Sequence, residues 1–224
     1  MLVLLLIALP LVATGMTFAQ AKKLMYQIYE DNPVTLYCGC TFKNKQVNWD
    51  SCGYEVRKNL TRARRVEAEH IVPAAEFGKS LQCWQEPICV RRTGTKYKGR
   101  ACCEKINPKF RAMYTDLRNL AVAIGEINGD RLDYPFGIAT GQGYGACEML
   151  IDRQLRIAYP PERSRGLIAR TYLYMQATYG LALTPEQQTL YQEWDERYPK
   201  SDWEITRETK IAQLQAEPVH LAGG

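Results

Sequence analysis

The sequence predicts a single mixed α+β domain that is stapled by disulfides. Three observations lead to this fold class: an even set of eight cysteines, short apolar runs between loops in the first half, and helical patterns in the second half. The 224 residues fit one domain, and a hydrophobic content of 46% is enough to build a core. The net charge of +5 permits an anionic partner without identifying one.

The beginning of the chain has the pattern of an export signal. The first 19 residues carry no charged side chain, and their apolar stretch falls short of the roughly 20 residues needed to cross a bilayer. Small residues at Thr17, Ala19 and Ala21 suit a signal peptidase. We therefore expect a signal peptide over 1–19, with cleavage after Ala19 or Ala21, and a mature domain over 22–224. An uncleaved anchor is the alternative, because no basic residue precedes the apolar stretch.

All eight cysteines are expected to form disulfides, because thiols are oxidised in the compartments to which an export signal leads. A zinc site is disfavoured, since the sequence has no C-x-x-C pair and only two histidines. Spacing leaves the pairing open, except that adjacent cysteines must bond to different partners. The predicted disulfide cysteines are Cys38, Cys40, Cys52, Cys83, Cys89, Cys102, Cys103 and Cys147.

The first half of the mature chain is predicted to be an irregular platform. Leu24 and Ile28 follow helical spacing until Pro33 interrupts it, which indicates a short helix. From residue 34 to about residue 114, cysteine, glycine and basic residues surround short apolar runs. We expect loops and brief strands there, pinned by disulfides.

The second half is predicted to be mainly helical. The run at 119–128 is expected to form a helix that Gly129 ends, and the apolar run at 147–151 to form a strand. Three further helices carry apolar stripes that are typical of a core. They are expected over 162–179, from Thr184 with a capping box to Gln187, and from Ser201 with a capping box to Glu204.

Two adjacent side chains have the chemistry that phosphodiester hydrolysis needs. His70 is one of two histidines, the other being His220 in the tail, so a general base near neutral pH has essentially one candidate. Glu69 offers a hard oxygen ligand that suits Mg²⁺. A glutamate beside a histidine is weak evidence by itself, and in an arbitrary protein a solvated surface pair would be the better interpretation.

The surrounding motifs strengthen the catalytic interpretation. They are YCGC at 37–40, CGYEVRK at 52–58, EAEHIVPAAEFG at 67–78, QCWQ at 82–85, NLAVAIGEINGDR at 119–131 and RGLIARTYLYM at 165–175. In this order and over nearly the whole mature chain, they resemble the bacterial endonuclease I family of periplasmic and secreted nucleases. The resemblance implies a ββα-metal nuclease core with additional helices, in which one divalent ion lies between a short β-hairpin and a helix.

The resemblance also implies roles for individual residues. The family's general base falls on His70, and its two metal ligands fall on Glu69 and Asn128. The implied cofactor is Mg²⁺, with Mn²⁺ or Ca²⁺ as alternatives. Asn119 is expected to support the hairpin by hydrogen bonding, although a helix N-cap is an equally good interpretation. Consecutive strand residues face opposite sides, so Glu69 and His70 are expected to share a site only if the strand is distorted there.

The phosphate-binding arginine of the family falls on Arg100, with Arg91 and Arg92 as alternatives, because this chain has extra residues in that stretch. Cys89 and one of the two adjacent cysteines are additional to the family pattern, which places one bridge in the inserted loop. The family's pair of C-terminal cysteines is absent here. The family's disulfide pairing is therefore an unsafe guide for this chain.

Basic residues flank the expected site on both sides and are expected to track phosphates, which would give binding with little sequence preference. They are Arg57, Lys58, Arg62, Arg64 and Arg65 before it, and Arg91, Arg92, Lys96, Lys98, Arg100, Lys105 and Lys109 after it. We expect a monomer in the periplasm or outside the cell, acting on double- and single-stranded DNA and also considered for RNA, without stable membrane association. An exported nucleic-acid-binding protein without catalysis is the alternative.

Overall fold

The computed structural model describes residues 15–139, 141 and 143–215 and has a mixed α+β fold. The longer helices are α1 (Phe18–Ile28), α6 (Pro108–Thr115), α8 (Glu162–Tyr179), α9 (Pro185–Arg197) and α10 (Asp202–Leu214). The shorter ones are α2 (Leu60–Ala63), α3 (Ala74–Gly78), α4 (Gln82–Gln85), α5 (Arg100–Ile106) and α7 (Gly125–Arg131). Two 3₁₀ turns occupy Trp49–Ser51 and Leu117–Asn119.

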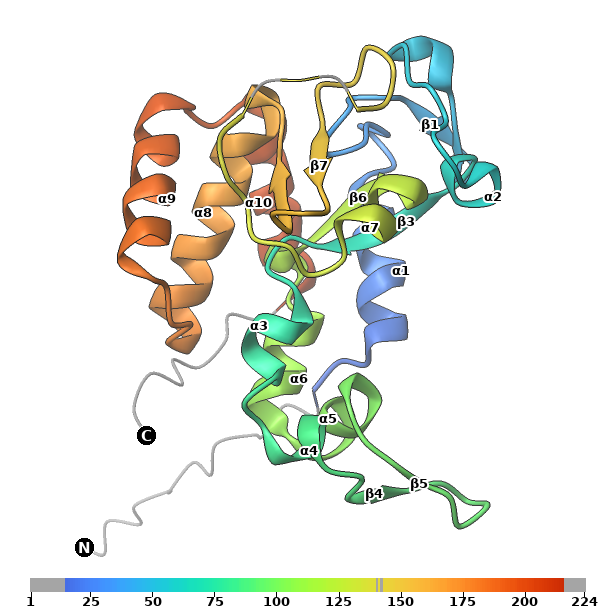
Figure 1. Ribbon diagram of the computed structural model, residues 1–224, viewed down its shortest axis with the longest axis vertical. Helices are drawn as coiled ribbons and strands as arrows, with labels where there is room; N and C mark the ends of the chain where they lie inside the picture. The colour runs from blue at the N-terminus through green and yellow to red at the C-terminus, as the bar shows by residue number, and fades with distance from the viewer. Residues whose placement is uncertain (1–14, 140, 142, 216–224) are drawn as a thin grey trace, which may run out of the picture.

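The strands form four two-stranded antiparallel sheets. They are β1 (Phe42–Lys43) with β2 (Gln46–Val47), β3 (Val66–His70) with β6 (Leu120–Ile124), β4 (Cys89–Val90) with β5 (Lys96–Tyr97), and β7 (Leu150–Asp152) with β8 (Ile157–Tyr159). Figure 1 shows the β3–β6 ribbon and α7 in the middle of the molecule, α8 and α9 side by side at one edge, and the β4–β5 hairpin projecting from the α4–α5 end.

Strand β6 is buried on both faces. Leu120 and Val122 pack in a cluster with Met25 of α1, whereas Ala121 and Ala123 belong to the larger core beneath α8 and α9. The predicted helix over 119–128 is therefore wrong: its first part is β6, and only its second part is helical, as α7. A strand covered on both sides is apolar at every position, and such a run cannot be distinguished from a buried helix by periodicity.

The three predicted C-terminal helices are confirmed. Helix α8 covers the expected residues and ends at Tyr179, and Gly180 after it adopts the left-handed conformation. Thr184 closes the predicted capping box at the start of α9. At the start of α10 the structure shows one of the two contacts of the predicted box, in which the Ser201 side chain accepts the Glu204 backbone N–H. The first helix differs, because α1 begins at Phe18 and so runs through both expected cleavage positions, Ala19 and Ala21.

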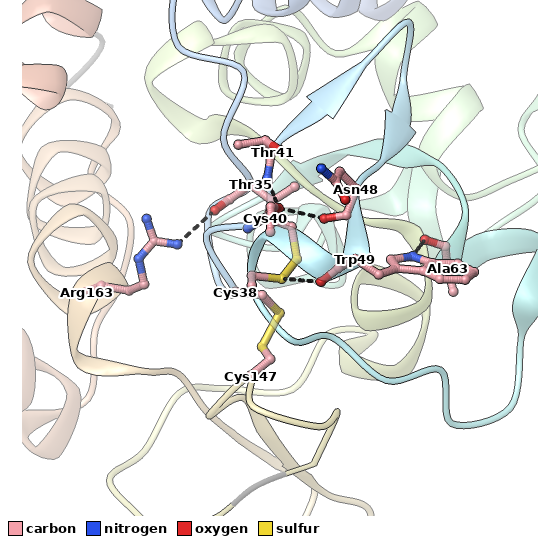
Figure 2. Close-up of a disulfide and its surroundings, with 11 residues drawn as sticks. Thr35, Cys38, Cys40, Thr41, Asn48, Trp49, Ala63, Cys147 and Arg163 are labelled. Carbon is pink, nitrogen blue, oxygen red and sulfur yellow. Dashed lines mark hydrogen bonds between the residues drawn. A yellow bond between two sulfur atoms is a disulfide. The ribbon is translucent and has the colours of Figure 1, made fainter.

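All eight cysteines are paired, and the chain has no free cysteine among the described residues. The adjacent cysteines have different partners, as predicted, and the extra bridge lies in the inserted loop around β4 and β5. Figure 2 shows the bridge between Cys38 and Cys147, beside the one that Cys40 makes. The pairs are Cys38–Cys147, Cys40–Cys52, Cys83–Cys103 and Cys89–Cys102.

Replacing both Cys38 and Cys147 by serine is expected to lower the free energy of unfolding more than replacing both Cys89 and Cys102. The two bridges span sequence separations of 109 and 13 residues. Closing the longer loop removes more conformational entropy from the unfolded chain. This corresponds to a stabilisation of about 4–5 kcal/mol for the longer loop, against about 3 kcal/mol for the shorter one. Urea unfolding of both double variants under non-reducing conditions measures the difference. An equal or smaller loss for the Cys38–Cys147 pair would contradict the expectation.

Within the part of the chain that the structure describes, no helix has the length and apolar character needed to span a membrane.

Candidate active site

A hollow of about 650 Å³ brings the four predicted site residues together. Glu69 and His70 reach it from β3, Asn128 from α7 and Arg100 from the start of α5. Other residues on its walls include Phe18, Lys22, Tyr26, Arg62 and Glu67. His220 lies outside the described residues, so His70 is the histidine that the structure places at this hollow.

His70 is buried, with 8% of its surface exposed, and a backbone contact sets which of its two ring nitrogens carries the proton. Its Nε2 lies 2.8 Å from the carbonyl oxygen of Tyr114. A carbonyl oxygen only accepts hydrogen bonds, so Nε2 carries the proton and Nδ1 carries the lone pair. Burial lowers the pKa of His70 to about 4 against the opposing effect of this hydrogen bond, with smaller contributions from the charges of Arg100 and Arg131. The imidazole is therefore neutral at pH 7, as a general base must be.

Glu69 is almost fully buried and points to a different set of partners. Its Oε1 accepts hydrogen bonds from the Tyr37 hydroxyl at 2.7 Å and from Arg131 NH1 at 2.6 Å. The pairing of β3 with β6 continues without interruption through His70, so the strand pairing lacks the distortion on which a shared site was conditional. Both side chains border the hollow because it runs along the open edge of β3, which has a neighbouring strand on one side only.

Helix α7 covers that open edge with side chains. Asn128 Nδ2 donates to the carbonyl oxygen of Ala68 at 3.3 Å, and Arg131 donates to the carbonyl oxygens of His70 and Ile71, both at 2.8 Å. These contacts satisfy backbone groups that an edge strand would otherwise leave unpaired. Arg131 is 1% exposed and also holds Glu69, so it fixes the end of β3 relative to α7.

The orientation of the Asn128 amide follows from its partners. Its Nδ2 also donates to Glu67 Oε2 at 3.2 Å. Both neighbours are acceptors, so the amide nitrogen must face them, and the carbonyl oxygen Oδ1 lies at the other end of the amide. Glu67 is itself held by ion pairs with Arg62 and Arg65.

Two glycines of α7 make room for this arrangement. A Cβ atom at Gly129 would lie 2.0 Å from Arg62 NH1, and one at Gly125 would lie 2.8 Å from Glu67 Oε1. The ion pair of Arg62 with Glu67 thus lies against the backbone of the helix that carries Asn128. Residues with a side chain at either glycine position would push this pair away from the helix.

The chain is similar to known proteins over nearly its whole length. Its sequence matches the Endonuclease I family over residues 11–218. The chain belongs to the endonuclease I family. It is 43% identical over 219 residues to a protein named "Periplasmic deoxyribonuclease" from Aeromonas hydrophila, covering 94% of this chain and 87% of that protein. It is 44% identical over 206 residues to an "Extracellular deoxyribonuclease" of the same species, with coverage of 89% and 84%. An "Endonuclease-1" from Buchnera aphidicola subsp. Acyrthosiphon pisum is 41% identical over 204 residues, with coverage of 88% and 77%.

As a member of the endonuclease I family, the protein is a nuclease that hydrolyses phosphodiester bonds. Of the three arginines considered for phosphate binding, Arg100 borders the hollow and the other two do not. Its guanidinium lies 5.7 Å from the ring centre of Tyr114, whose carbonyl holds His70. Arg91 lies over the ring of Tyr97 at 4.9 Å, on the β4–β5 hairpin.

Asn119 and three other residues have roles at the site that the sequence left open or did not predict. Asn119 exchanges two hydrogen bonds with the backbone of Val72, at 2.7 and 3.1 Å, which supports the pair of strands β3 and β6 and does not fit a helix N-cap. Glu67, Arg131 and Phe18 were not predicted. Glu67 shares the EAEH motif and lies two residues before Glu69, so strand spacing could have placed both carboxylates on one face.

Proposed function

We propose that this endonuclease I protein is a Mg²⁺-dependent endonuclease that cuts DNA with little sequence preference and uses His70 as its general base. The observation that carries the proposal is the neutral imidazole whose Nδ1 holds a lone pair at the same hollow as Asn128 and Arg100. The presence of this imidazole at one hollow with Asn128, Glu69 and Arg100 supports catalysis over the alternative of nucleic-acid binding alone. Two of the relatives above are named deoxyribonucleases, which supports DNA as the substrate.

We infer that β3, β6 and α7 are the ββα-metal core of the family. The support is their connectivity: two antiparallel strands are followed by a helix that starts where β6 ends and packs on both strands. His70 is the last residue of the first strand, and Asn128 lies in the middle of the helix. A group held between this ribbon and this helix would lie beside both residues.

The donor chemistry fits a hard divalent cation. Asn128 offers Oδ1, because Glu67 and Ala68 hold the other end of its amide. Glu69 offers Oε2, since its contacts with Tyr37 and Arg131 use Oε1. Magnesium is commonly held by few protein oxygens and several waters, and the described residues contain no cluster of three or more acidic, histidine or cysteine ligands. Mn²⁺ and Ca²⁺ accept the same oxygen ligands and are the alternatives.

Each residue has a part in the proposed reaction. His70 Nδ1 takes a proton from the attacking water, while the hydrogen bond to Tyr114 keeps Nε2 protonated. The guanidinium of Arg100 pairs with the phosphate oxygens. The cation, when bound, offsets charge on the phosphoryl oxygens and the leaving group. Arg62 and Lys22 border the same hollow and add positive charge along the path of the backbone.

Contacts of this kind are made to phosphates, so they distinguish neither the base sequence nor single-stranded from double-stranded DNA. We therefore propose double- and single-stranded DNA as substrates and RNA as a further one. The protein acts in the periplasm or outside the cell, because four disulfides require an oxidising compartment, and relatives are named for both locations.

Digestion of supercoiled plasmid by the purified protein tests the proposal. We expect nicked and then linear DNA in the presence of Mg²⁺, and no cleavage after addition of a chelator. Parallel reactions with single-stranded DNA and RNA define the substrate range, and reactions with Mn²⁺ or Ca²⁺ identify the cation. Cleavage that is unaffected by the chelator would refute the metal, and DNA retention without cleavage under every condition would favour the binding alternative.

A further inference from the structure

The start of α1 lies against the proposed general base. The ring centre of Phe18, the first residue of the helix, is 5.1 Å from that of His70 and 4.6 Å from that of Tyr114. The rings of His70 and Tyr114 are 4.7 Å apart and nearly parallel. Each of the three rings therefore contacts the other two, and Phe18 belongs to the immediate packing of the imidazole.

Several contacts hold Phe18 in this place. Thr17 caps the helix and closes a capping box with Gln20. The Phe18 backbone N–H donates to Glu104 Oε1 of α5 at 2.9 Å, which ties it to the helix that Arg100 begins. Ala21, one turn further along α1, has no exposed surface and packs in the core cluster on β3 and β6. The position of Phe18 is thus set by its cap, by α5 and by the buried face of α1.

Cleavage at either position expected from the sequence would undo these contacts. A cut after Ala19 removes Phe18 and the Thr17 cap, and a cut after Ala21 also removes a fully buried residue. Losing the cap leaves backbone N–H groups at the start of α1 without a partner, and losing the Phe18 ring exposes one side of His70. An uncharged apolar stretch followed by small residues suggested those cuts, whereas the contacts of residues 17–21 tie this segment to α5 and to the core cluster.

We propose that Phe18 is retained in the mature enzyme as a positioning residue for His70, and that the signal peptide is removed before Thr17. The inference rests on the proposed role of His70 as general base. The hydrogen bond to the Tyr114 carbonyl fixes one nitrogen of the imidazole, and Phe18 packs against the ring so that it cannot swing away from the hollow. Nδ1 then keeps a constant direction toward the attacking water.

The mature N-terminus is the first test. Protein exported by cells that make the full chain is purified, and its first residue is determined by N-terminal sequencing and intact mass. We expect a first residue at Thr17 or earlier. A fully active enzyme that starts at Gln20 or Lys22 would overturn the proposal, because it would lack Phe18 and still work.

Substitution of Phe18 is the second test. Phe18→Ala is expected to lower kcat about tenfold with little change in KM, because ring orientation is needed in the transition state and not for DNA binding. Phe18→Tyr keeps an aromatic ring and is expected to stay within about twofold of wild type. Leu24→Ala is the matched control, because Leu24 packs from the same helix into the same core cluster without lining the hollow, and it is expected to keep the wild-type kcat.

Imidazole nitrogen shifts in NMR give a readout that is independent of cleavage. The chain has two histidines, so the His70 signals are assigned by comparison with His220→Ala. Wild type is expected to show the Nε2-protonated tautomer, and Phe18→Ala a mixture of tautomers. Unchanged kcat and unchanged shifts in Phe18→Ala would refute the positioning role. Cleavage at the wild-type rate by His70→Ala would instead refute the proposed function on which the inference rests.

Discussion

Asn128→Ala is expected to raise the Mg²⁺ concentration that gives half-maximal cleavage by about 10- to 100-fold or more, the loss found even for partners that only orient a ligand. The reason is that Oδ1 of Asn128 is one of the few protein oxygens proposed to hold the cation. The side chain is partly exposed on α7, so the free energy of unfolding is expected to change by less than about 1 kcal/mol. Single-turnover cleavage rates over a Mg²⁺ titration measure the shift, and activity should partly return at high Mg²⁺. Normal cleavage at limiting Mg²⁺ would show that Asn128 is not a ligand.

Glu67 provides a sharper version of this test. Its carboxylate holds the Asn128 amide, so Glu67→Ala is expected to weaken the response to Mg²⁺ by releasing that amide. The effect should vanish when Asn128 is already alanine, because no amide is left to orient. If Glu67 instead bound the cation directly, the double variant would be weaker than Asn128→Ala alone.

Glu69 is a less informative position for the same question. Its carboxylate pairs with Arg131 inside the protein, where both side chains are almost fully buried. Removing one partner of a buried pair costs about 3–5 kcal/mol, because the other charge is left uncompensated. We therefore expect Glu69→Ala to lower stability as well as metal use, whereas Asn128→Ala separates the two.

Sequence patterns predicted elements correctly where the deciding residues are close together in the chain, and failed where distant segments decide. Helices α9 and α10 were predicted at their first residues, because a capping side chain and its partner lie within four positions of each other. Strand β6 was predicted as a helix, because the two faces of LAVAI are buried by elements from opposite ends of the chain. The expected cleavage after Ala19 or Ala21 stays a prediction, since small residues suit a peptidase whether or not they also pack in a core, as Ala21 does.

The site shows the same division. The family motifs identified Glu69, His70, Arg100 and Asn128, and the structure places all four at one hollow. The motifs succeed because their order carries information about the whole fold. Arg131 lies within one of these motifs, yet its role depends on reaching the carbonyl oxygens of His70 and Ile71 at the open strand edge. A contact of that kind has no local pattern, so only the folded structure could identify it.

His70→Ala is expected to lose cleavage about 10²- to 10⁴-fold, the usual contribution of a general base, while DNA binding survives. Binding rests on basic side chains that contact phosphates, and none of these contacts needs the imidazole. The direct measurement is the single-turnover cleavage rate at saturating Mg²⁺, together with the DNA dissociation constant in the same low-salt buffer. His220→Ala is the matched control, since it removes the other histidine of the chain. We predict that His70→Ala binds DNA like wild type and barely cuts it, and that His220→Ala binds and cuts DNA like wild type. A His70→Ala protein that cuts within a few-fold of wild type would contradict the mechanism.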